Sequence, residues 1–369
     1  MQTSKLALLA LGLSLAAMAI PQAASAAGLQ TKVLDSYPTD SSLINPWGIS
    51  ASSSGPFWVS DNGKTVSTLY SVNPTTDATT KLLLAVTIPG NGSVTGQVFN
   101  GTASFGGDSF LFVSEDGTVS GWRGILGTAA ETLQAGSTAN VYKGSAFATL
   151  GGSSYLYAAN FKTGTIDVLK GSAAAPNLSG SFTDSNLTSG YAPFNIQNLA
   201  GNLFVTYALQ DATKSGDLAG AGHGFVDEFD TRGNYMRRIA SGGGLDSPWG
   251  LALAPSSLGS FTGDLLVGNF GDGRINAFDI SGTGTPVLVG QLPGAGASPL
   301  TIDGLWALTP GNNGGAGSSQ KLYYTAGPSA ETGGVLGVLV PVPEASSLMT
   351  FGLLLILGGI AAVRRTKKA

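Results

Sequence analysis

The chain has 369 residues, no cysteine, only 11% charged residues and a formal net charge of −4. The absence of cysteine excludes disulfides, thiol nucleophiles and zinc–thiolate sites. Its 55 glycines are about twice the usual share. The 43% hydrophobic content, spread over recurrent β-forming runs, nevertheless indicates a folded core. An acidic chain without a basic stripe is not expected to bind nucleic acid.

The first 26 residues have the layout of a secretory signal peptide. Lys5 precedes an apolar stretch over residues 6–20, and Ala24-Ser25-Ala26 provides a small-x-small site for signal peptidase. We therefore expect the mature domain to begin at Ala27 and to fold outside the cytoplasm. Without the residues of the two terminal segments, 13 basic and 21 acidic residues remain, which gives the mature part a net charge of −8.

Residues 342–369 combine the three parts of a C-terminal processing signal. Pro343 and Glu344 belong to a short polar motif, and residues 348–363 form an apolar run of nearly membrane-spanning length. The basic tail that follows contains Arg364, Arg365, Lys367 and Lys368. This tail is expected to stay in the cytoplasm, with everything before Pro343 outside. A plain C-terminal membrane anchor is the alternative interpretation.

The order of these parts resembles the PEP-CTERM sorting signal of Gram-negative bacteria, with Ala345 where that signal has its second proline. The resemblance implies processing by an exosortase-like membrane peptidase after transient anchoring in the inner membrane. It also implies a final location in the periplasm, on the outer cell surface or in the extracellular matrix.

Residues 27–341 repeat at intervals of about fifty residues. Each unit opens with a short apolar strand, and a strand of large apolar residues, a Gly/Asp/Asn turn and an alternating strand follow. The closest match is between residues 45–49, Asn-Pro-Trp-Gly-Ile, and residues 247–251, Ser-Pro-Trp-Gly-Leu. The second segments of the six units are residues 57–63, 110–117, 155–161, 202–207, 263–270 and 322–327.

Six units of short strands without a convincing helix predict an all-β fold, a six-bladed β-propeller. The repeat fits because a blade must bury both faces of its sheet against its neighbours. A double sandwich does not explain the period, and a β-helix would repeat faster. Residues 29–34 alternate in polarity and are expected to supply the outer strand of the sixth blade, which closes the ring.

Three tryptophans, Trp47, Trp249 and Trp306, stand at the start of their units. We expect them to pack in the core as wedges between blades. A platform on which carbohydrate rings stack is the alternative.

Polar residues recur in or before the first strands and at the ends of the second strands. The first strand of each blade lines the central channel of a propeller, so these side chains are expected near one channel mouth. The candidates are Asn45, Asn100, Asn195, Gln197 and Asp303 from the first strands, and Asp61, Glu115, Asn160 and Asn269 from the second strands. Oxygen ligands of this kind suit Ca²⁺ or another divalent cation. The alternative is that they cap turns.

Support for catalysis is weak. His223, the only histidine, lies between two glycines in a long insertion and is expected to be an exposed loop residue. No nucleophile elbow, Walker loop or dinucleotide fingerprint appears in a suitable context. A metal-assisted hydrolase needs no histidine and therefore stays open.

The segments 45–49, 114–118, 157–161 and 264–273 resemble an uncharacterised family of exported bacterial proteins with NHL-like six-bladed propellers, some of which end in PEP-CTERM signals. This resemblance implies the fold and the export route but no established activity. The repeat is more distantly similar to gluconolactonase-type propellers, whose channel holds a divalent cation. That similarity implies Glu115, Asn195 and Asp303 as cation ligands.

The sequence thus predicts an exported, C-terminally sorted propeller that serves as a binding or structural module of the cell envelope or extracellular matrix. Its expected partners are signal peptidase, an exosortase-like enzyme, and an extracellular polysaccharide or envelope protein. The alternative is a divalent-cation-dependent hydrolase or lactonase at the channel mouth. A soluble periplasmic ligand sensor is a third hypothesis.

Overall fold

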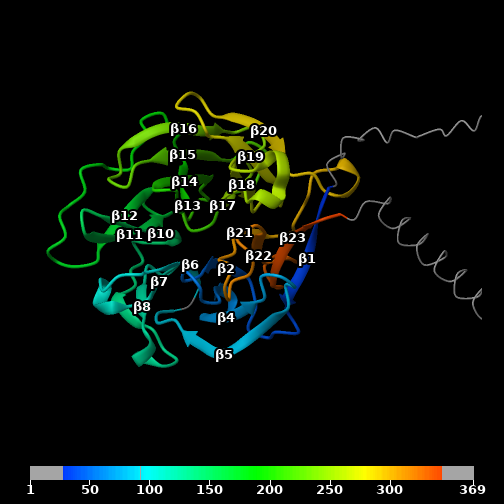
Figure 1. Cartoon of the computed structure of the whole chain (residues 1–369). Helices are drawn as coiled ribbons and strands as arrows, with labels where there is room; N and C mark the ends of the chain where they lie inside the picture. Colours follow the sequence, from blue (N-terminus) through cyan, green and yellow to red (C-terminus); the bar gives the residue numbers. More distant parts are fainter. Residues whose placement is uncertain (1–27, 92, 343–369) are drawn as a thin grey trace, which may run out of the picture. The chain divides into compact units, whose positions relative to one another are not determined.

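The computed structural model describes residues 28–91 and 93–342, which form six antiparallel sheets around a central axis (Figure 1). The predicted all-β, six-bladed propeller is therefore confirmed. Within the described residues no helix is long and apolar enough to cross a membrane. The expected signal peptide, residues 1–26, and the C-terminal signal from Pro343 onward lie outside the described residues.

Each blade runs from an innermost to an outermost strand. Blade 1 contains β2 (Pro46–Ser50), β3 (Phe57–Asp61), β4 (Val66–Val72) and β5 (Thr79–Thr87). Blade 2 contains β6 (Val94–Phe99), β7 (Phe110–Ser114), β8 (Val119–Trp122) and β9 (Glu131–Gln134). Blade 3 contains β10 (Tyr142–Leu150), β11 (Ser153–Asn160) and β12 (Thr165–Lys170).

The second half of the ring follows the same order. Blade 4 contains β13 (Tyr191–Leu199), β14 (Asn202–Leu209), β15 (Phe225–Phe229) and β16 (Tyr235–Ser241). Blade 5 contains β17 (Pro248–Leu253), β18 (Leu265–Asn269), β19 (Ile275–Asp279) and β20 (Val287–Gln291). Blade 6 contains β21 (Leu305–Pro310), β22 (Leu322–Ala326), β23 (Val335–Pro341) and β1 (Leu29–Ser36).

Short 3₁₀ turns occupy some of the connections. They are η1 (Asn62–Lys64), η2 (Phe105–Gly107), η3 (Gly124–Leu126), η4 (Ser256–Phe261) and η5 (Ala295–Ala297).

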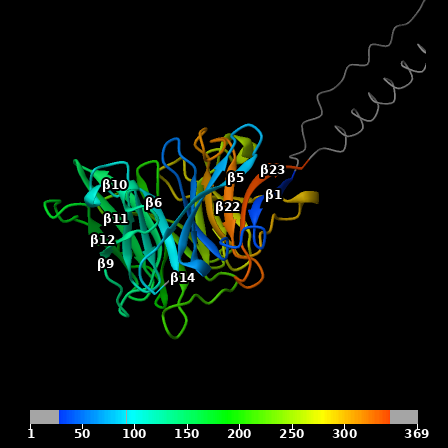
Figure 2. The same ribbon diagram turned by 90° about the horizontal axis from the view of Figure 1, so that it is seen from below.

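The ring closes by pairing the two ends of the propeller domain. β1 lies antiparallel to β23, from Leu29 opposite Pro341 to Ser36 opposite Val335. Figures 1 and 2 show β1 beside β23 in both views. The expectation that residues 29–34 supply the outer strand of the sixth blade is therefore confirmed. This arrangement ties the first and last strands into one sheet and covers an edge of β23 that would otherwise be unpaired.

Packing between blades follows from the two-residue period of the strands. In β3, Phe57 and Val59 face blade 6 and pack with Tyr323, whereas Trp58 faces blade 2 and stacks on Phe110 with ring centroids 4.0 Å apart. Each sheet thus buries apolar side chains on both faces. This explains why a single unit cannot stand alone and why the sequence repeats.

The inner ends of all six blades share one irregularity. In every pair of first and second strands the register shifts just after the first matched residues, as between Pro46 and Ile49 in blade 1. Such a bulge redirects a side chain out of the alternating pattern. The residues that directly follow the last matched residue before the shift are, in the six blades, Trp47, Thr95, Lys143, Phe194, Trp249 and Trp306.

The aromatic residues at this position meet on the axis and fill it. Trp47 of blade 1 stacks on Trp306 of blade 6 with ring centroids 3.5 Å apart. It meets Trp249 of blade 5 edge to face, with ring centroids 6.1 Å apart. The centroid of the Trp47 ring also lies 6.3 Å from that of Phe194 in the opposite blade 4. We call these four rings, with Phe270 stacked on Trp306, the aromatic plug. The tryptophans are buried core residues, as expected, but they pack across the axis and do not wedge between neighbouring blades.

Blade 3 departs from the pattern because it has three strands. Residues 171–190, where a fourth strand is expected, instead reach blade 4. There the Phe182 N–H donates to the carbonyl of Gly233, and the Gly180 N–H donates to that of Arg232. This segment also brings Asp184 to Arg238 of β16, so an irregular strap replaces the outer strand.

Candidate functional site: the channel mouth

One face of the propeller gathers polar side chains above the aromatic plug. The inner strands begin on this face and the second strands end on it, so loops from all blades converge there. We define the mouth cluster as Asn45, Asn62, Glu115, Lys143, Asp217 and Glu331. Blades 1, 2, 3, 4 and 6 each contribute to it, and blade 5 adds the buried Ser247 beside Asp217.

A continuous series of hydrogen bonds crosses half of the mouth. The indole Nε1 of Trp306 donates to Asn45 Oδ1 over 2.8 Å. Asn45 Nδ2 then donates to Glu331 Oε2 over 2.5 Å and to Asn62 Oδ1 over 3.3 Å. Asn62 Nδ2 donates to Glu115 Oε2 over 3.3 Å, and Glu115 Oε1 pairs with the ammonium of Lys143. The plug and the mouth cluster are therefore one connected unit.

Lys143 supplies the central positive charge. It takes the position in β10 that Trp47 and Trp249 take in their blades, and only 4% of its side chain is exposed. Its Nζ lies 5.0 Å from the centre of the Trp47 ring and 5.8 Å from that of Phe161. A buried ammonium is stable only when it is paired, and Glu115 together with these ring faces provides the pairing.

Two carboxyl groups of the mouth cluster are short of positive charge. Burial raises the pKa of Glu331, the nearby charges of Glu115 and Asp217 raise it further, and the amide of Asn45 and the charge of Lys143 lower it. Burial likewise raises the pKa of Asp217, with the hydroxyl of Ser247 and Lys143 acting in the opposite direction. One ammonium thus serves three carboxyl groups, and two of them hold their protons more tightly than in water.

The backbone around the mouth is held in an unfavourable conformation. Asn45 and Ser247, each directly before an inner strand, have φ of 47° and 45°. Residues 329–331 are all left-handed, with φ of 60°, 51° and 65°. A non-glycine residue in this region costs about 1–2 kcal/mol. Strain of this kind concentrates at functional sites, where the fold must hold a side chain in one place.

Of the predicted site residues, Asn45 and Glu115 lie in the mouth cluster. Asp303 lies beside it: its exposed carboxylate accepts the N–H of Ser329 over 2.9 Å and so supports the turn that carries Glu331.

Asn160 and Asn269 end their strands on the same face but serve local turns. Asn160 accepts the N–H of Val141 and donates to Asn140 and Asp167, and Asn269 donates to the Gly244 carbonyl and to Asp272.

The other candidates lie elsewhere. Asn100 follows β6 and therefore lies at the opposite end of the ring, where it donates to the carbonyls of Ser104 and Asp108. Asn195 lies within β13 and ties it to β17 by donating to the Trp249 carbonyl over 2.7 Å. Gln197 continues along β13, away from the mouth.

Asp61 points between blades 1 and 6. Burial raises its pKa well above the ordinary value, and it accepts a hydrogen bond from Thr68 over 2.6 Å. Its alternation with Phe57 and Val59 along β3 explains why it faces the neighbouring blade and not the channel.

His223 lies in the insertion between β14 and β15. Its Nδ1 lies 2.8 Å from the Leu218 carbonyl oxygen. His223 is a loop residue, as expected, but it is half-buried and not exposed.

The donor set does not fit the expected divalent cation. Within residues 28–91 and 93–342, no three His, Cys, Asp or Glu side chains lie close enough together to hold one metal ion. Glu115 and Glu331 are joined through Asn62 and Asn45, and Glu115 pairs with Lys143. Lys143 supplies there the positive charge that a bound cation would provide.

Sequence reasoning missed Lys143, Asn62, Asp217 and Glu331. Lys143 leaves a signal, because the Lys-Gly pair 143–144 stands where units one and five have Trp-Gly. Asn62 directly follows the candidate Asp61. Asp217 and Glu331 lie in connections whose course no strand pattern predicts.

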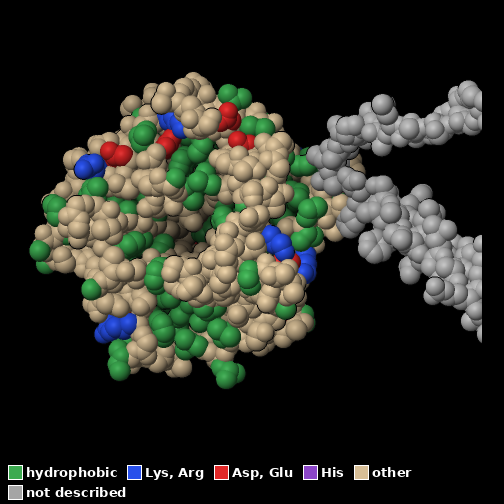
Figure 3. All heavy atoms as spheres, in the orientation of Figure 1, with side chains coloured by type: hydrophobic (Ala, Val, Ile, Leu, Met, Phe, Trp, Pro, Cys, Tyr) green, Lys and Arg blue, Asp and Glu red, His purple; other side chains and the backbone are tan. Residues whose placement is uncertain are grey.

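A recess adjoins the mouth at Glu115. It has a volume of about 450 Å³ and lies between the 90–91 and 136–141 segments, with Lys162 at its border. Figure 3 shows one face of the molecule, hollowed at the centre where the blades converge.

Solved structures share the architecture at low sequence identity. The α-L-arabinanase of Penicillium chrysogenum, complexed with arabinobiose, superimposes with a TM-score of 0.51 and 12% identity over 85% of this chain and 98% of that one. A glucose dehydrogenase superimposes with a TM-score of 0.50 and 11% sequence identity, over 85% of this chain and 100% of that one. At this identity the likeness shows the fold alone.

Among curated proteins, the similar sequences come from Acanthamoeba polyphaga mimivirus, and no family model matches the chain. The uncharacterized protein L690 is 29% identical over 82% of this chain and 81% of its own length. The uncharacterized protein R648 is 31% identical over 320 residues, which cover 81% of this chain and 75% of that protein. The chain therefore belongs to the family of propeller proteins that includes the uncharacterized mimivirus protein R648.

Proposed function

We propose that this protein is a binding module whose ligand is a small organic cation, an amine with several N–H donors, held at the channel mouth. The observation that carries the proposal is the charge balance of the mouth cluster. Lys143 is the one ammonium in a cluster with three carboxyl groups, and burial raises the pKa of Asp217 and of Glu331 more than Lys143 and their hydrogen-bond partners lower it.

The spacing of the carboxyl groups favours an organic cation over a metal ion. The three groups are too far apart to chelate one ion, whereas an amine with donors on several atoms can bridge them. The aromatic plug fills the axis next to the mouth cluster, to which the Trp306 indole is hydrogen-bonded. Rigid supports, the strained turn at Glu331 and the buried Asn45, hold the acceptors in place before the ligand arrives.

Isothermal titration with spermidine and glucosamine, and with glucose as the neutral control, tests this proposal. Binding a cation favours the ionised carboxylates, so affinity should rise as pH increases from 5 to 7.5. Glu331→Gln should weaken amine binding about ten-fold through loss of a charge-assisted bond. Asp279→Asn, an exposed carboxylate on β19, is the matched control and should change nothing.

Two results would overturn the proposal. One is the absence of amine binding throughout this pH range. The other is equal binding by the triple variant Glu115→Gln/Asp217→Asn/Glu331→Gln, because that would place the ligand outside the mouth cluster.

Hydrolysis at the same mouth is the second candidate function. It is favoured by two carboxyl groups in unlike surroundings, because burial raises the pKa of Glu331 whereas Glu115 pairs with Lys143, and acid–base hydrolysis uses two carboxyl groups whose environments differ. This version needs no divalent cation, unlike the lactonase hypothesis drawn from the sequence. A panel of glycoside, ester and lactone substrates with and without EDTA separates the two: turnover that survives EDTA and is lost in Glu331→Gln supports it.

Export and C-terminal sorting are part of the proposal for the cellular role, with an envelope or matrix polysaccharide or protein as the wider partner. They rest on the residue patterns of segments 1–26 and 342–369, and the mimivirus relatives add no support for a bacterial sorting signal. Expression of the full chain in a Gram-negative host, followed by N-terminal sequencing, should give Ala27 as the first residue. An intact Met1 on the cytoplasmic product would reject export.

A further inference from the structure

Three connections enclose the recess beside Glu115, at the junction of blades 2 and 3. They are the connection between β5 and β6, the turn between β7 and β8, and the connection between β9 and β10. Together they line the recess with hydroxyl and amide side chains, which are Asn91, Thr118, Ser137, Thr138 and Asn140. Its volume of about 450 Å³ lies within the range of about 300–1,000 Å³ that is typical of small-molecule sites.

Thr118 brings to this recess a buried hydroxyl that the protein itself does not use. Only 2% of the residue is exposed, and its Oγ1 makes no hydrogen bond within the part of the chain that the structure describes. Two glycines of the recess keep the space beside this atom open. A Cβ atom on Gly90 would lie 2.7 Å from Oγ1, and one on Gly136 would lie 3.0 Å from it. Because a buried polar group without a partner is costly, this hydroxyl marks a place where a polar ligand gains a hydrogen bond.

The charges around the recess favour a ligand with one ammonium and otherwise uncharged polar groups. The side chain of Glu115 is 29% exposed, so a ligand can reach its carboxylate. The carboxylate of Asp116 already accepts the N–H groups of Asn91 over 2.7 Å and of Thr118 over 2.9 Å. Lys162 lies half-buried at the border, where it would repel a second ammonium that entered the recess.

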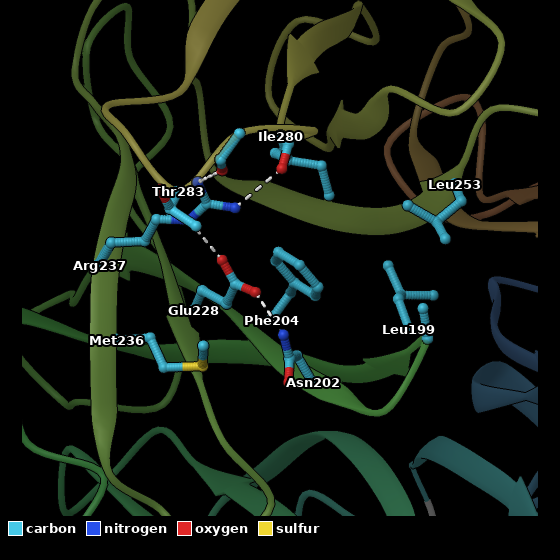
Figure 4. A pocket seen from close by; sticks show the side chains of 11 residues that line it. Leu199, Asn202, Phe204, Glu228, Met236, Arg237, Leu253, Ile280 and Thr283 are labelled. Atoms are coloured by element: carbon cyan, nitrogen blue, oxygen red, sulfur yellow. Dashed lines mark hydrogen bonds and ion pairs between the residues drawn. The ribbon is translucent and has the colours of Figure 1, made fainter.

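A groove between blades 4 and 5 provides a contrast. There Arg237 extends toward Ile280 and donates to its carbonyl over 3.0 Å, with Glu228 below it (Figure 4). The two oxygens of Glu228 accept hydrogen bonds from Arg237 and from Asn202, each over 2.6 Å. The charged groups of this groove of about 360 Å³ are thus bonded within the protein, so a polar ligand would gain less there than at the unused hydroxyl of Thr118.

We propose that the recess binds the hydroxyl-bearing ring of an amino sugar whose ammonium bonds to Glu115. This inference rests on the function proposed above and names the class of amine. The ring hydroxyls bond to Thr118 and to the hydroxyl and amide groups of the flanking connections. A polyamine fits less well, because its further ammonium groups would lie near Lys162, and a neutral sugar lacks the charge that Glu115 favours.

Isothermal titration at pH 7 with glucosamine, spermidine and glucose tests the inference. The unaltered protein should bind glucosamine about ten-fold more tightly than either of the other two, since only glucosamine combines the ammonium with hydroxyls. Thr118→Val removes the hydroxyl and keeps the volume of the side chain. It should weaken glucosamine binding about five-fold and leave spermidine binding unchanged. Its urea midpoint should match that of the unaltered protein, because the lost hydroxyl has no partner among the described residues.

Two further variants separate the hydroxyl from other effects of substitution. Thr118→Ser retains the hydroxyl and should bind glucosamine more tightly than Thr118→Val does. Thr132→Val makes the same change at an exposed position of β9, outside the recess, and should leave the affinity for both amines unaltered.

The three ligands distinguish failure of this inference from failure of the proposed function. Spermidine binding as tight as that of glucosamine, or unchanged glucosamine binding by Thr118→Val, would overturn the amino sugar and leave amine binding at the mouth intact. Glucose binding as tight as that of glucosamine would overturn both, because the ammonium would then contribute nothing. Absence of binding by either amine would also overturn both.

Discussion

At the scale of single residues, several carboxyl groups in this protein share one positively charged side chain. The mouth cluster has one ammonium for three carboxyl groups. A second case is Asp227 on β15, which is fully buried and shares the guanidinium of Arg238 with Asp184. Burial raises the pKa of Asp227 to about 7, and Arg238 counteracts only part of this effect.

This shift predicts a pH-dependent contribution of Asp227 to stability. In the unfolded chain Asp227 ionises near its ordinary pKa of 3.8, whereas the folded protein keeps the proton up to about pH 7. Its contribution is therefore fully present below pH 4 and is lost as pH rises toward 7, by about 1.4 kcal/mol per pH unit.

Urea denaturation at pH 5 and 7.5 measures the effect. The stability of the unaltered protein relative to Asp227→Asn should fall by about 2–3 kcal/mol between the two values. Asp279→Asn, at an exposed position, should show no such trend. Parallel pH profiles for the unaltered protein and Asp227→Asn would contradict the assignment.

At the scale of elements, the inner strands depend on glycines that let neighbouring backbones approach. A side chain at Gly144 of β10 would collide with Asn195 of β13, including its Cα atom. The equivalent Gly48, Gly96 and Gly250 likewise face the backbone of the next inner strand. The ring around the axis is therefore as narrow as backbone contact allows, which lets the aromatic plug fill it.

Replacing Gly144 by alanine should destabilise the protein by about 2–3 kcal/mol, because the colliding atoms belong to a buried strand that cannot shift freely. Gly124→Ala is the matched control, since a Cβ there meets no atom within 4 Å. Denaturant midpoints of the two variants provide the comparison. Equal midpoints for the two variants would show that β10 and β13 can move apart without loss of stability.

At the scale of the whole molecule, stability depends on closure of the ring by β1. This strand covers the edge of β23 and buries Leu29 against the interface of blades 5 and 6. In a repeat architecture each unit is stabilised by its neighbours, so opening one junction weakens both ends.

A variant lacking residues 28–36 should therefore unfold at a lower temperature and over a broader range than the complete propeller, as followed by circular dichroism. A synthetic peptide of the β1 sequence added in excess should raise the midpoint again by binding the vacated edge. Val33→Ser, at an exposed position of β1, is the control for changes in sequence alone. A deletion variant with an unchanged, sharp transition would show that β1 does not close the ring.

Much of the fold could be predicted because it is encoded locally. Alternating apolar residues mark the strands, the repeat interval of about fifty residues gives the number of blades, and the alternation of residues 29–34 indicates the closing strand. The missing fourth strand of blade 3 was not predictable, since residues 171–190 are held by contacts with blade 4.

The sequence by itself thus determined the six-bladed ring and its closure, because strand periodicity and repeat length are properties of neighbouring residues. Only the tertiary structure decided which polar residues face the axis. A bulge common to all six blades redirects Lys143 and the tryptophans into the channel, and left-handed turns carry Glu331 to the mouth. Residues 143, 217 and 331 share no spacing in the chain; they meet because ring geometry brings the same end of every blade to one point.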